Sequence, residues 1–230
     1  MNKKRTLLTV VALILVCLLS VMGTIAYLQA NTTTVTNTFV AAGGPGPFVD
    51  PDPDDETKMP FAIKEYEVTQ ASSGMYTMDT SKEVAGLEYK LVMPGTTIPK
   101  QAFVKLSRTA VDGIAPAPAY LYLEVIDGLP AAYSWEIDDS NWEALSGVTG
   151  VNGGTVYLYI GSLADAKHVV TNIAACTSNT INIIKDNEVV VDKDANLDAT
   201  PVTLSFNAYL AQASTGKTDD PAAVFTACFG

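Results

Sequence analysis

Residue types that commonly perform catalysis are few in this sequence and poorly placed. The chain has a single histidine, His168, so a Ser-His-Asp triad would have to combine it with residues such as Ser162 and Asp165. The chain contains neither the G-x-S-x-G turn that exposes a nucleophilic serine nor the H-E-x-x-H pattern of zinc proteases. We therefore predict that the protein is not an enzyme and has no catalytic or transition-metal residues.

Neighbouring carboxylates occur at Asp54-Asp55 and Asp138-Asp139. Glycosidase chemistry needs two carboxyl groups that face each other across a cleft, one with its pKa raised by burial. Both pairs stand among turn-forming residues, which favours exposed turns. Asp192–Asp198 places oxygen ligands at alternate positions, as a calcium loop does, but Leu197 stands where such a loop needs glycine. We expect a polar turn there, with Ca²⁺ as the alternative and no other cofactor.

Aromatic residues offer binding chemistry, because they stack on sugars and pack at interfaces. Tyr120 and Tyr122 alternate along one expected strand, and Trp135 and Trp142 follow it. They could form the ligand face of a surface adhesin; the alternative is that the tryptophans pack in the core.

Composition and charge restrict the class of protein. The 230 residues include 14 lysines and arginines and 25 acids, for a net charge of −11. Nucleic acid is not expected as a partner, because phosphate binding needs a basic face. The chain is 48% hydrophobic and 17% charged, which is too apolar for a disordered acidic protein. Its length fits one domain with appendages.

Residues 1–26 have the pattern of a secretory signal peptide, which we expect to be helical. Lys3, Lys4 and Arg5 precede an uncharged, Leu- and Val-rich stretch that ends near Met22. Small residues favour cleavage between Ala26 and Tyr27, with the bond after Ala30 as the alternative site. A retained membrane anchor is the alternative to cleavage, although the apolar stretch is short for a spanning helix. We therefore expect a secreted or cell-surface protein that contacts the membrane only before cleavage.

Export also bears on the cysteines. Removal of the signal peptide would leave Cys176 and Cys228, and an oxidising environment permits a disulfide between them. Two buried thiols are the equal alternative.

The segment that follows, residues 27–40, predicts an extended strand in which Val35, Asn37 and Phe39 share one face. Residues 41–58 form a linker rich in Gly, Pro and Asp, which disfavours regular structure. A strand on such a tether can add to an open sheet edge. If that edge belongs to another copy, the contact is head to tail and builds a filament. The alternatives are pairing within its own domain and a disordered stalk.

Residues 59–230 read as many short strands separated by turns, with a helix only near Asp219–Phe229. Residues 119–126 and 202–210 show clear alternation, and Gly150–Gly154 is a strong hairpin signal. The segment 133–137 and the stretch near Trp142 suggest a strand pair, and so do 179–185 and 188–191. The fold class is therefore all-β, an antiparallel jelly-roll-like β-sandwich with little helix outside the signal peptide.

Several stretches resemble a known family. Gly23–Leu28 and Val35–Phe39 resemble the start of exported bacterial proteins processed by a SipW-type signal peptidase, the TasA/camelysin-like family of biofilm-matrix and cell-surface proteins. Met93–Lys100 resembles that family's Pro-Gly turn, and Leu204–Ala213 its last long strand. The resemblance implies a jelly-roll-like sandwich, secretion and, in some members, matrix fibres built by donor-strand exchange. The acidic, Pro-rich linker departs from the pattern.

These observations lead to one main expectation. The chain is expected to be a secreted structural protein of the cell surface or biofilm matrix, which forms fibres by head-to-tail donor-strand complementation. Its partners would be other copies of itself, with cell-wall or matrix components as further candidates. The alternative is a surface adhesin that binds through a face of the sandwich.

Overall fold

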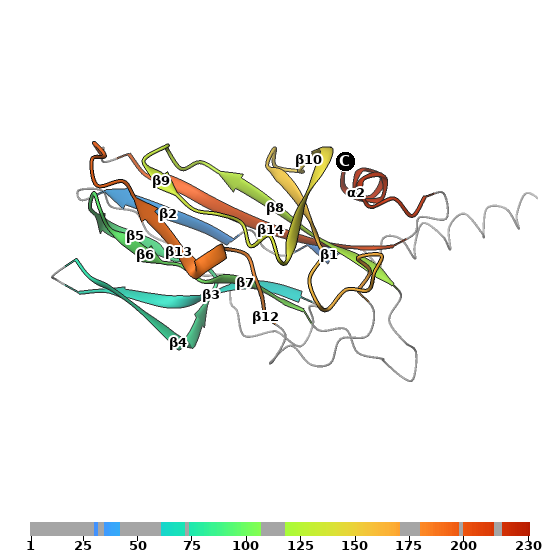
Figure 1. The fold of residues 1–230 in the computed structure, drawn as a ribbon, viewed down its shortest axis with the longest axis horizontal. Helices are drawn as coiled ribbons and strands as arrows, with labels where there is room; N and C mark the ends of the chain where they lie inside the picture. Colours follow the sequence, from blue (N-terminus) through green and yellow to red (C-terminus); the bar gives the residue numbers. More distant parts are fainter. Residues whose placement is uncertain are drawn as a thin grey trace, which may run out of the picture.

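The computed structural model describes residues 30–31, 35–41, 61–71, 74–106, 118–170, 180–197, 200–213 and 218–230. Within these ranges the protein is an all-β sandwich with one α-helix near the C-terminus, as the sequence predicts (Figure 1).

Part of the expected N-terminal organisation lies outside the described residues. This holds for the signal peptide, for the cleavage site between Ala26 and Tyr27, and for linker residues 42–58. The strand expected from Tyr27 to Val40 is described at residues 30–31 and 35–41. Cleavage before Tyr27, and a strand that begins at Tyr27, therefore stay predictions.

The largest layer is a seven-stranded sheet in the order β10-β11-β8-β14-β2-β5, with β1 also paired to β14. All its pairs are antiparallel except that of β2 with β5, which is parallel. The strands are β1 Ala30–Asn31, β2 Val35–Ala41, β5 Glu88–Val92, β8 Ala119–Asp127, β10 Trp142–Thr149, β11 Thr155–Tyr159 and β14 Val202–Gln212.

Two smaller antiparallel sheets complete the strand layers. One has the order β12-β7-β3-β4 and the other β6-β13-β9. Their strands are β3 Phe61–Gln70, β4 Tyr76–Val84, β6 Thr97–Pro99, β7 Ala102–Leu106, β9 Tyr133–Ser134, β12 Thr180–Asn182 and β13 Glu188–Val191. A short 3₁₀ turn, η2 Lys185–Asn187, precedes β13.

The alternating strands supply the centre of the core. On β8, Leu121 and Leu123 are fully buried in the main hydrophobic cluster, together with Leu204 and Phe206 of β14. The other face of β8 carries Tyr120 and Tyr122, which belong to a second buried cluster. The sheet therefore has two apolar faces, and each needs a covering layer.

Helix α2, Pro221–Phe229, covers the second face. Asp220 caps it by accepting a 2.9 Å hydrogen bond from the Ala223 N–H, and Pro221 occupies the first turn, where its missing N–H costs nothing. Phe225 is fully buried against the sheet. Because the Tyr122 hydroxyl donates to the Pro221 carbonyl, the start of the helix is also fixed to β8.

Two predicted pairings are wrong, although the strands exist. β9 pairs with β13, and β10 pairs with β11, so the strands on either side of Asp138–Asn141 do not form a hairpin. Likewise β12 pairs with β7, whereas β13 pairs with β6 and β9. The chain passes between the two small sheets at Asp186 and Asn187, whose φ values of 58° and 56° are left-handed. Local sequence suggested hairpins, but distant partners complete the sheets.

Candidate functional site: the strand slot beside β14

Strand β14 is the longest strand described, and both of its edges are occupied. One edge pairs with β8 from Leu204 to Gln212. The other pairs with β2 from Val202 to Phe206 and with β1 at Tyr209 and Leu210. An N-terminal segment that is remote in sequence therefore lines β14 over most of its length.

β2 lies between β14 and β5, and the region that it fills is here called the strand slot. Within the described part of the chain, β5 joins the seven-stranded sheet through β2, with Thr38 opposite Glu88 and Phe39 opposite Tyr89. Removal of β2 would therefore open a gap bounded by the edge of β14 on one side and β5 on the other. Each edge would then expose unpaired backbone N–H and C=O groups.

The register determines which side of the sheet each position of β2 occupies. Positions 35, 37 and 39 lie opposite Phe206, Leu204 and Val202. Directly opposed positions of an antiparallel pair lie on the same side of a sheet. Phe206 and Leu204 are fully buried in the main core. The expected donor-strand residues Val35, Asn37 and Phe39 thus occupy the core-side positions of the slot.

In this single chain, residues 35–41 fill the slot of their own sheet. This corresponds to one of the two alternatives left by the sequence, pairing within the chain's own domain. Donation of the strand to another copy stays a proposal.

A buried ion pair lies beneath the β5 side of the slot. Lys100 Nζ lies 2.6 Å from Glu65 Oε2, and both side chains are fully buried. The ammonium also lies 5.5 Å from the centre of the Tyr89 ring. Tyr89 is the β5 residue opposite Phe39. Burial raises the pKa of Glu65 and lowers that of Lys100, although their mutual attraction opposes both shifts. The pair joins β3 to the chain just before β7.

A second buried carboxylate, Glu124 of β8, is held entirely by neutral donors among the described contacts. It accepts hydrogen bonds from the Tyr209 hydroxyl at 2.6 Å, from the backbone N–H groups of Asn152 and Gly154, and from the amides of Asn152 and Asn207. Burial raises its pKa, but these hydrogen bonds outweigh burial and hold the pKa below its ordinary value. Neither buried acid could be predicted from the sequence, because their partners are distant in the chain.

Of the two expected pairs of turn acids, Asp138-Asp139 is described and Asp54-Asp55 lies outside the described residues. Asp138 Oδ1 accepts hydrogen bonds from the N–H and hydroxyl of Ser140, as predicted for a solvated turn. Asp165 accepts from the N–H groups of Lys167 and Val169 and so caps the turn that contains His168.

The expected calcium loop is only partly described. Asp192 accepts a hydrogen bond from the Asp194 N–H, as in a polar turn, and Asp198 lies outside the described residues. Among described residues, no group of three or more His, Cys, Asp or Glu side chains gathers as metal ligands would. Cys228 is half-buried on α2 and Cys176 is not described, so both alternatives, a disulfide and two buried thiols, stay open.

The aromatic residues considered for an adhesin face are largely covered. Tyr120 and Tyr122 lie beneath α2, and Trp142 is buried with its Nε1–H donating to the Asn182 carbonyl at 2.7 Å. Trp135 is half-buried, donates to Asp127 and packs against Phe206. These side chains therefore contribute to packing, and none offers a broad exposed ring face.

No family model, curated protein or solved structure matches the chain. In the part of the chain that the structure describes, no helix has the length and apolar character required to cross a bilayer.

Proposed function

We propose that this chain is an exported structural protein of the cell surface or extracellular matrix, and that it assembles head to tail. In this assembly, residues 27–40 of one copy fill the strand slot of the next. The observation that carries the proposal is the position of β2, an N-terminal strand inserted between β14 and β5. Its partners are other copies of the chain, with matrix or cell-wall components as further candidates.

Energetics support exchange of this strand. An empty slot would leave a row of backbone groups unpaired, and each buried unpaired group costs about 1–3 kcal/mol. The slot must therefore be filled. A strand from a neighbouring copy would make the same hydrogen bonds as the chain's own strand, so the two arrangements differ mainly in the entropy of the tether and in protein concentration.

The connection between β2 and the body also supports exchange. Residues 42–60 separate β2 from β3 and are rich in Gly, Pro and Asp. Such a connection, fully extended, reaches at most about 70 Å, so β2 can either return to its own slot or reach an adjacent molecule. The positive segment and apolar stretch before residue 27 support export of the chain.

Cysteine pairing tests the proposal directly. Thr38 lies opposite Thr203 in the register, on the side of the sheet away from positions 37 and 39. In a chain with Cys176 and Cys228 replaced by serine, Thr38→Cys protein is mixed with Thr203→Cys protein under assembly conditions. We expect a disulfide-linked heterodimer on a non-reducing gel. Thr38→Cys mixed with Thr155→Cys is the matched control, because Thr155 lies on β11, away from the slot.

Electron microscopy gives the second readout. The mature chain is expected to form filaments, and deletion of residues 27–40 is expected to abolish them. Unchanged filaments after this deletion would rule out donor-strand exchange. Donor-strand exchange would also be ruled out if the Thr38→Cys/Thr203→Cys double variant formed disulfides only within single chains under conditions where filaments form.

A further inference from the structure

The outer strand β4 is interrupted by a bulge. Its register with β3 runs regularly from Gln70 opposite Tyr76 to Glu67 opposite Asp79, and it resumes with Tyr66 opposite Glu83. Thr80, Ser81 and Lys82 therefore oppose no residue of β3. They are exposed, at the margin of the molecule that the β3–β4 hairpin forms (Figure 1).

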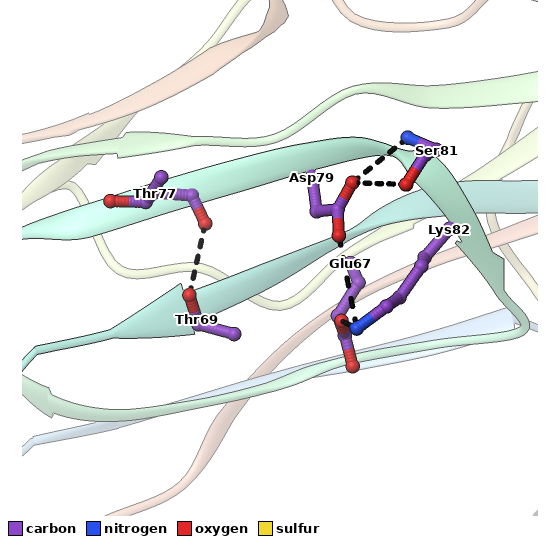
Figure 2. A network of polar contacts seen from close by, with 6 residues as sticks. All are labelled: Glu67, Thr69, Thr77, Asp79, Ser81 and Lys82. Carbon is purple, nitrogen blue, oxygen red and sulfur yellow. Dashed lines mark hydrogen bonds and ion pairs between the residues drawn. The ribbon is translucent and has the colours of Figure 1, made fainter.

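Side chains hold this bulge in shape (Figure 2). Asp79 Oδ1 accepts hydrogen bonds from the Ser81 N–H at 3.0 Å and the Ser81 hydroxyl at 2.6 Å. Lys82 Nζ lies 2.9 Å from Glu67 Oε2 on β3 and 3.7 Å from Asp79 Oδ2. These four side chains are here called the clasp. The Asp79 carboxylate accepts the hydrogen bond of the Ser81 N–H, so this group is not available to another strand. Lys82 places an ammonium group on the same edge.

The other sheet edges in the described residues are also unsuited to strand addition. β12, β6 and β9 have only three, three and two residues, and β5 carries the exposed, charged side chain of Lys90. β10 carries its own irregularity, because Ala144 lies opposite Tyr157 but Thr149 lies opposite Thr155. Short, bulged or charged edges are the known means by which sheets avoid pairing with other molecules.

One edge differs from these. β14 has eleven residues, and its edge beside the slot pairs regularly with β2 from Val202 to Phe206. A molecule that assembles by strand addition needs a single accepting edge, because a second accepting edge would join filaments side by side.

We propose that the clasped bulge of β4 prevents the outer edge of β4 from pairing with β4 of a second copy. Strand addition is thereby confined to the slot. The consequence for the fibre rests on the proposed function. The resistance of the β4 edge to pairing does not depend on it. Antiparallel β4–β4 pairing would relate two copies by a two-fold axis, so the species expected without the bulge is a closed dimer.

The register provides a clean variant. Deletion of residues 80–82 places Glu83 directly after Asp79, opposite Tyr66, so that every existing β3–β4 pair is preserved. The contact of Lys105 with Glu83, at 2.6 Å, is preserved as well. The deletion straightens β4 and leaves an uninterrupted edge from Tyr76 to Val84. It is made together with Asp79→Thr, because the loss of Lys82 would otherwise leave the Asp79 carboxylate directly opposite that of Glu67.

The test is made on a chain that cannot exchange its N-terminal strand. The Thr38→Cys/Thr203→Cys double variant, oxidised as a dilute monomer, locks β2 into its own slot. In this locked chain, deletion of residues 80–82 is expected to double the mass measured by light scattering at high concentration. Adding Thr77→Lys, an exposed position on the straightened edge, should restore the monomer, because a charge opposes edge pairing. In the unlocked chain the deletion should produce laterally joined filaments.

A locked deletion variant that shows the parent's circular dichroism and remains monomeric at every concentration overturns the proposal. If the deletion does not fold, the clasp variant Asp79→Thr/Lys82→Thr, which keeps the chain length, takes its place: dimerisation supports the proposal and a folded monomer overturns it. Failure of the parent chain to form filaments would count against the proposed function alone, because the locked chain is a monomer in either case.

Discussion

The Tyr209 hydroxyl donates a 2.6 Å hydrogen bond to Glu124 Oε2, which joins the two central strands β14 and β8 on the side covered by α2. The same carboxylate accepts from the backbone at Asn152 and Gly154 and so also holds the turn between β10 and β11. One buried side chain thus ties two strands to a hairpin turn. The close approach requires glycine, since a Cβ at position 154 would lie 2.4 Å from the Val125 carbonyl oxygen.

Stability should depend on the ionisation of Glu124. Its folded-state pKa lies below the ordinary value of 4.5, because its hydrogen bonds outweigh burial. The stabilisation is therefore complete above that value and is lost as the pH falls through the folded-state pKa. Glu124→Gln should lower the free energy of unfolding by about 1–3 kcal/mol at pH 7. Urea unfolding should show that the difference from the parent shrinks below the ordinary pKa.

The control for this prediction is Glu143→Gln, at an exposed position on β10. It should change stability by no more than about 0.5 kcal/mol. A difference between Glu124→Gln and the parent that stays constant across the acid range would contradict the ionisation argument.

The contrast between β14 and β4 shows what the sequence could predict. Leu204, Phe206, Ala208 and Leu210 alternate with other residues, and the structure buries all four in the core. In β4, Thr80–Lys82 interrupt the period of two, and no strand was expected there. Local alternation therefore identifies a regular strand, whereas a bulge that is fixed by contacts with another strand does not show in the pattern.

Strand partners and buried charges were harder to predict for a related reason. Lys100 and Glu65 are 35 positions apart, and each alone reads as an exposed residue. Only the pairing of β3 with β7 brings them together. The slot also depends on partners that are distant in the sequence. The sequence predicted an extended segment with Val35, Asn37 and Phe39 on one face, but its partners β14 and β5 follow only from the assembled sheet.

The buried pair Lys100–Glu65 should be costly to break and much less costly to replace. Lys100→Met leaves a fully buried carboxyl group without its ammonium and should destabilise the protein by about 3–5 kcal/mol. The double variant Lys100→Met/Glu65→Leu should recover a large part of that loss, because neither charge is then buried. A double-mutant cycle measured by denaturant unfolding gives the coupling.

The exposed pair Lys185–Glu136, at 3.0 Å, provides the comparison. Lys185→Gln should change stability little, since solvent already screens that contact. If the double variant in the core were as unstable as Lys100→Met alone, the desolvation argument would fail.

Helix α2 should depend on Phe225. Its ring lies 5.1 Å from that of Tyr122 and 5.6 Å from that of Tyr209, both in edge-on geometry, and the side chain is fully buried. Phe225→Ala should cost about 3–5 kcal/mol and increase the binding of a hydrophobic dye, because the aromatic face of the sheet loses its cover. Thr226→Ala, exposed on the same helix, should change stability little. Equal losses from the two substitutions would show that α2 is stabilised by something other than this packing.

The length of the connection between β2 and β3 should control whether the slot is filled from within the chain or by a neighbour. A long tether lets β2 return to its own slot, at an effective concentration that is in the millimolar range for a short flexible linker. Shortening the tether until the return is strained removes that advantage and leaves the contacts with a neighbour unchanged, which is the usual route to domain swapping. Deletion of residues 45–56 should therefore lower the protein concentration at which filaments appear, measured by sedimentation and electron microscopy.

Replacing the same residues with an equally long Gly-Ser segment is the matched control and should leave that concentration nearly unchanged. If instead the shortened chain remained monomeric and as stable as the parent, β2 would belong to its own sheet at any tether length, and strand exchange between copies would have no basis in this connection.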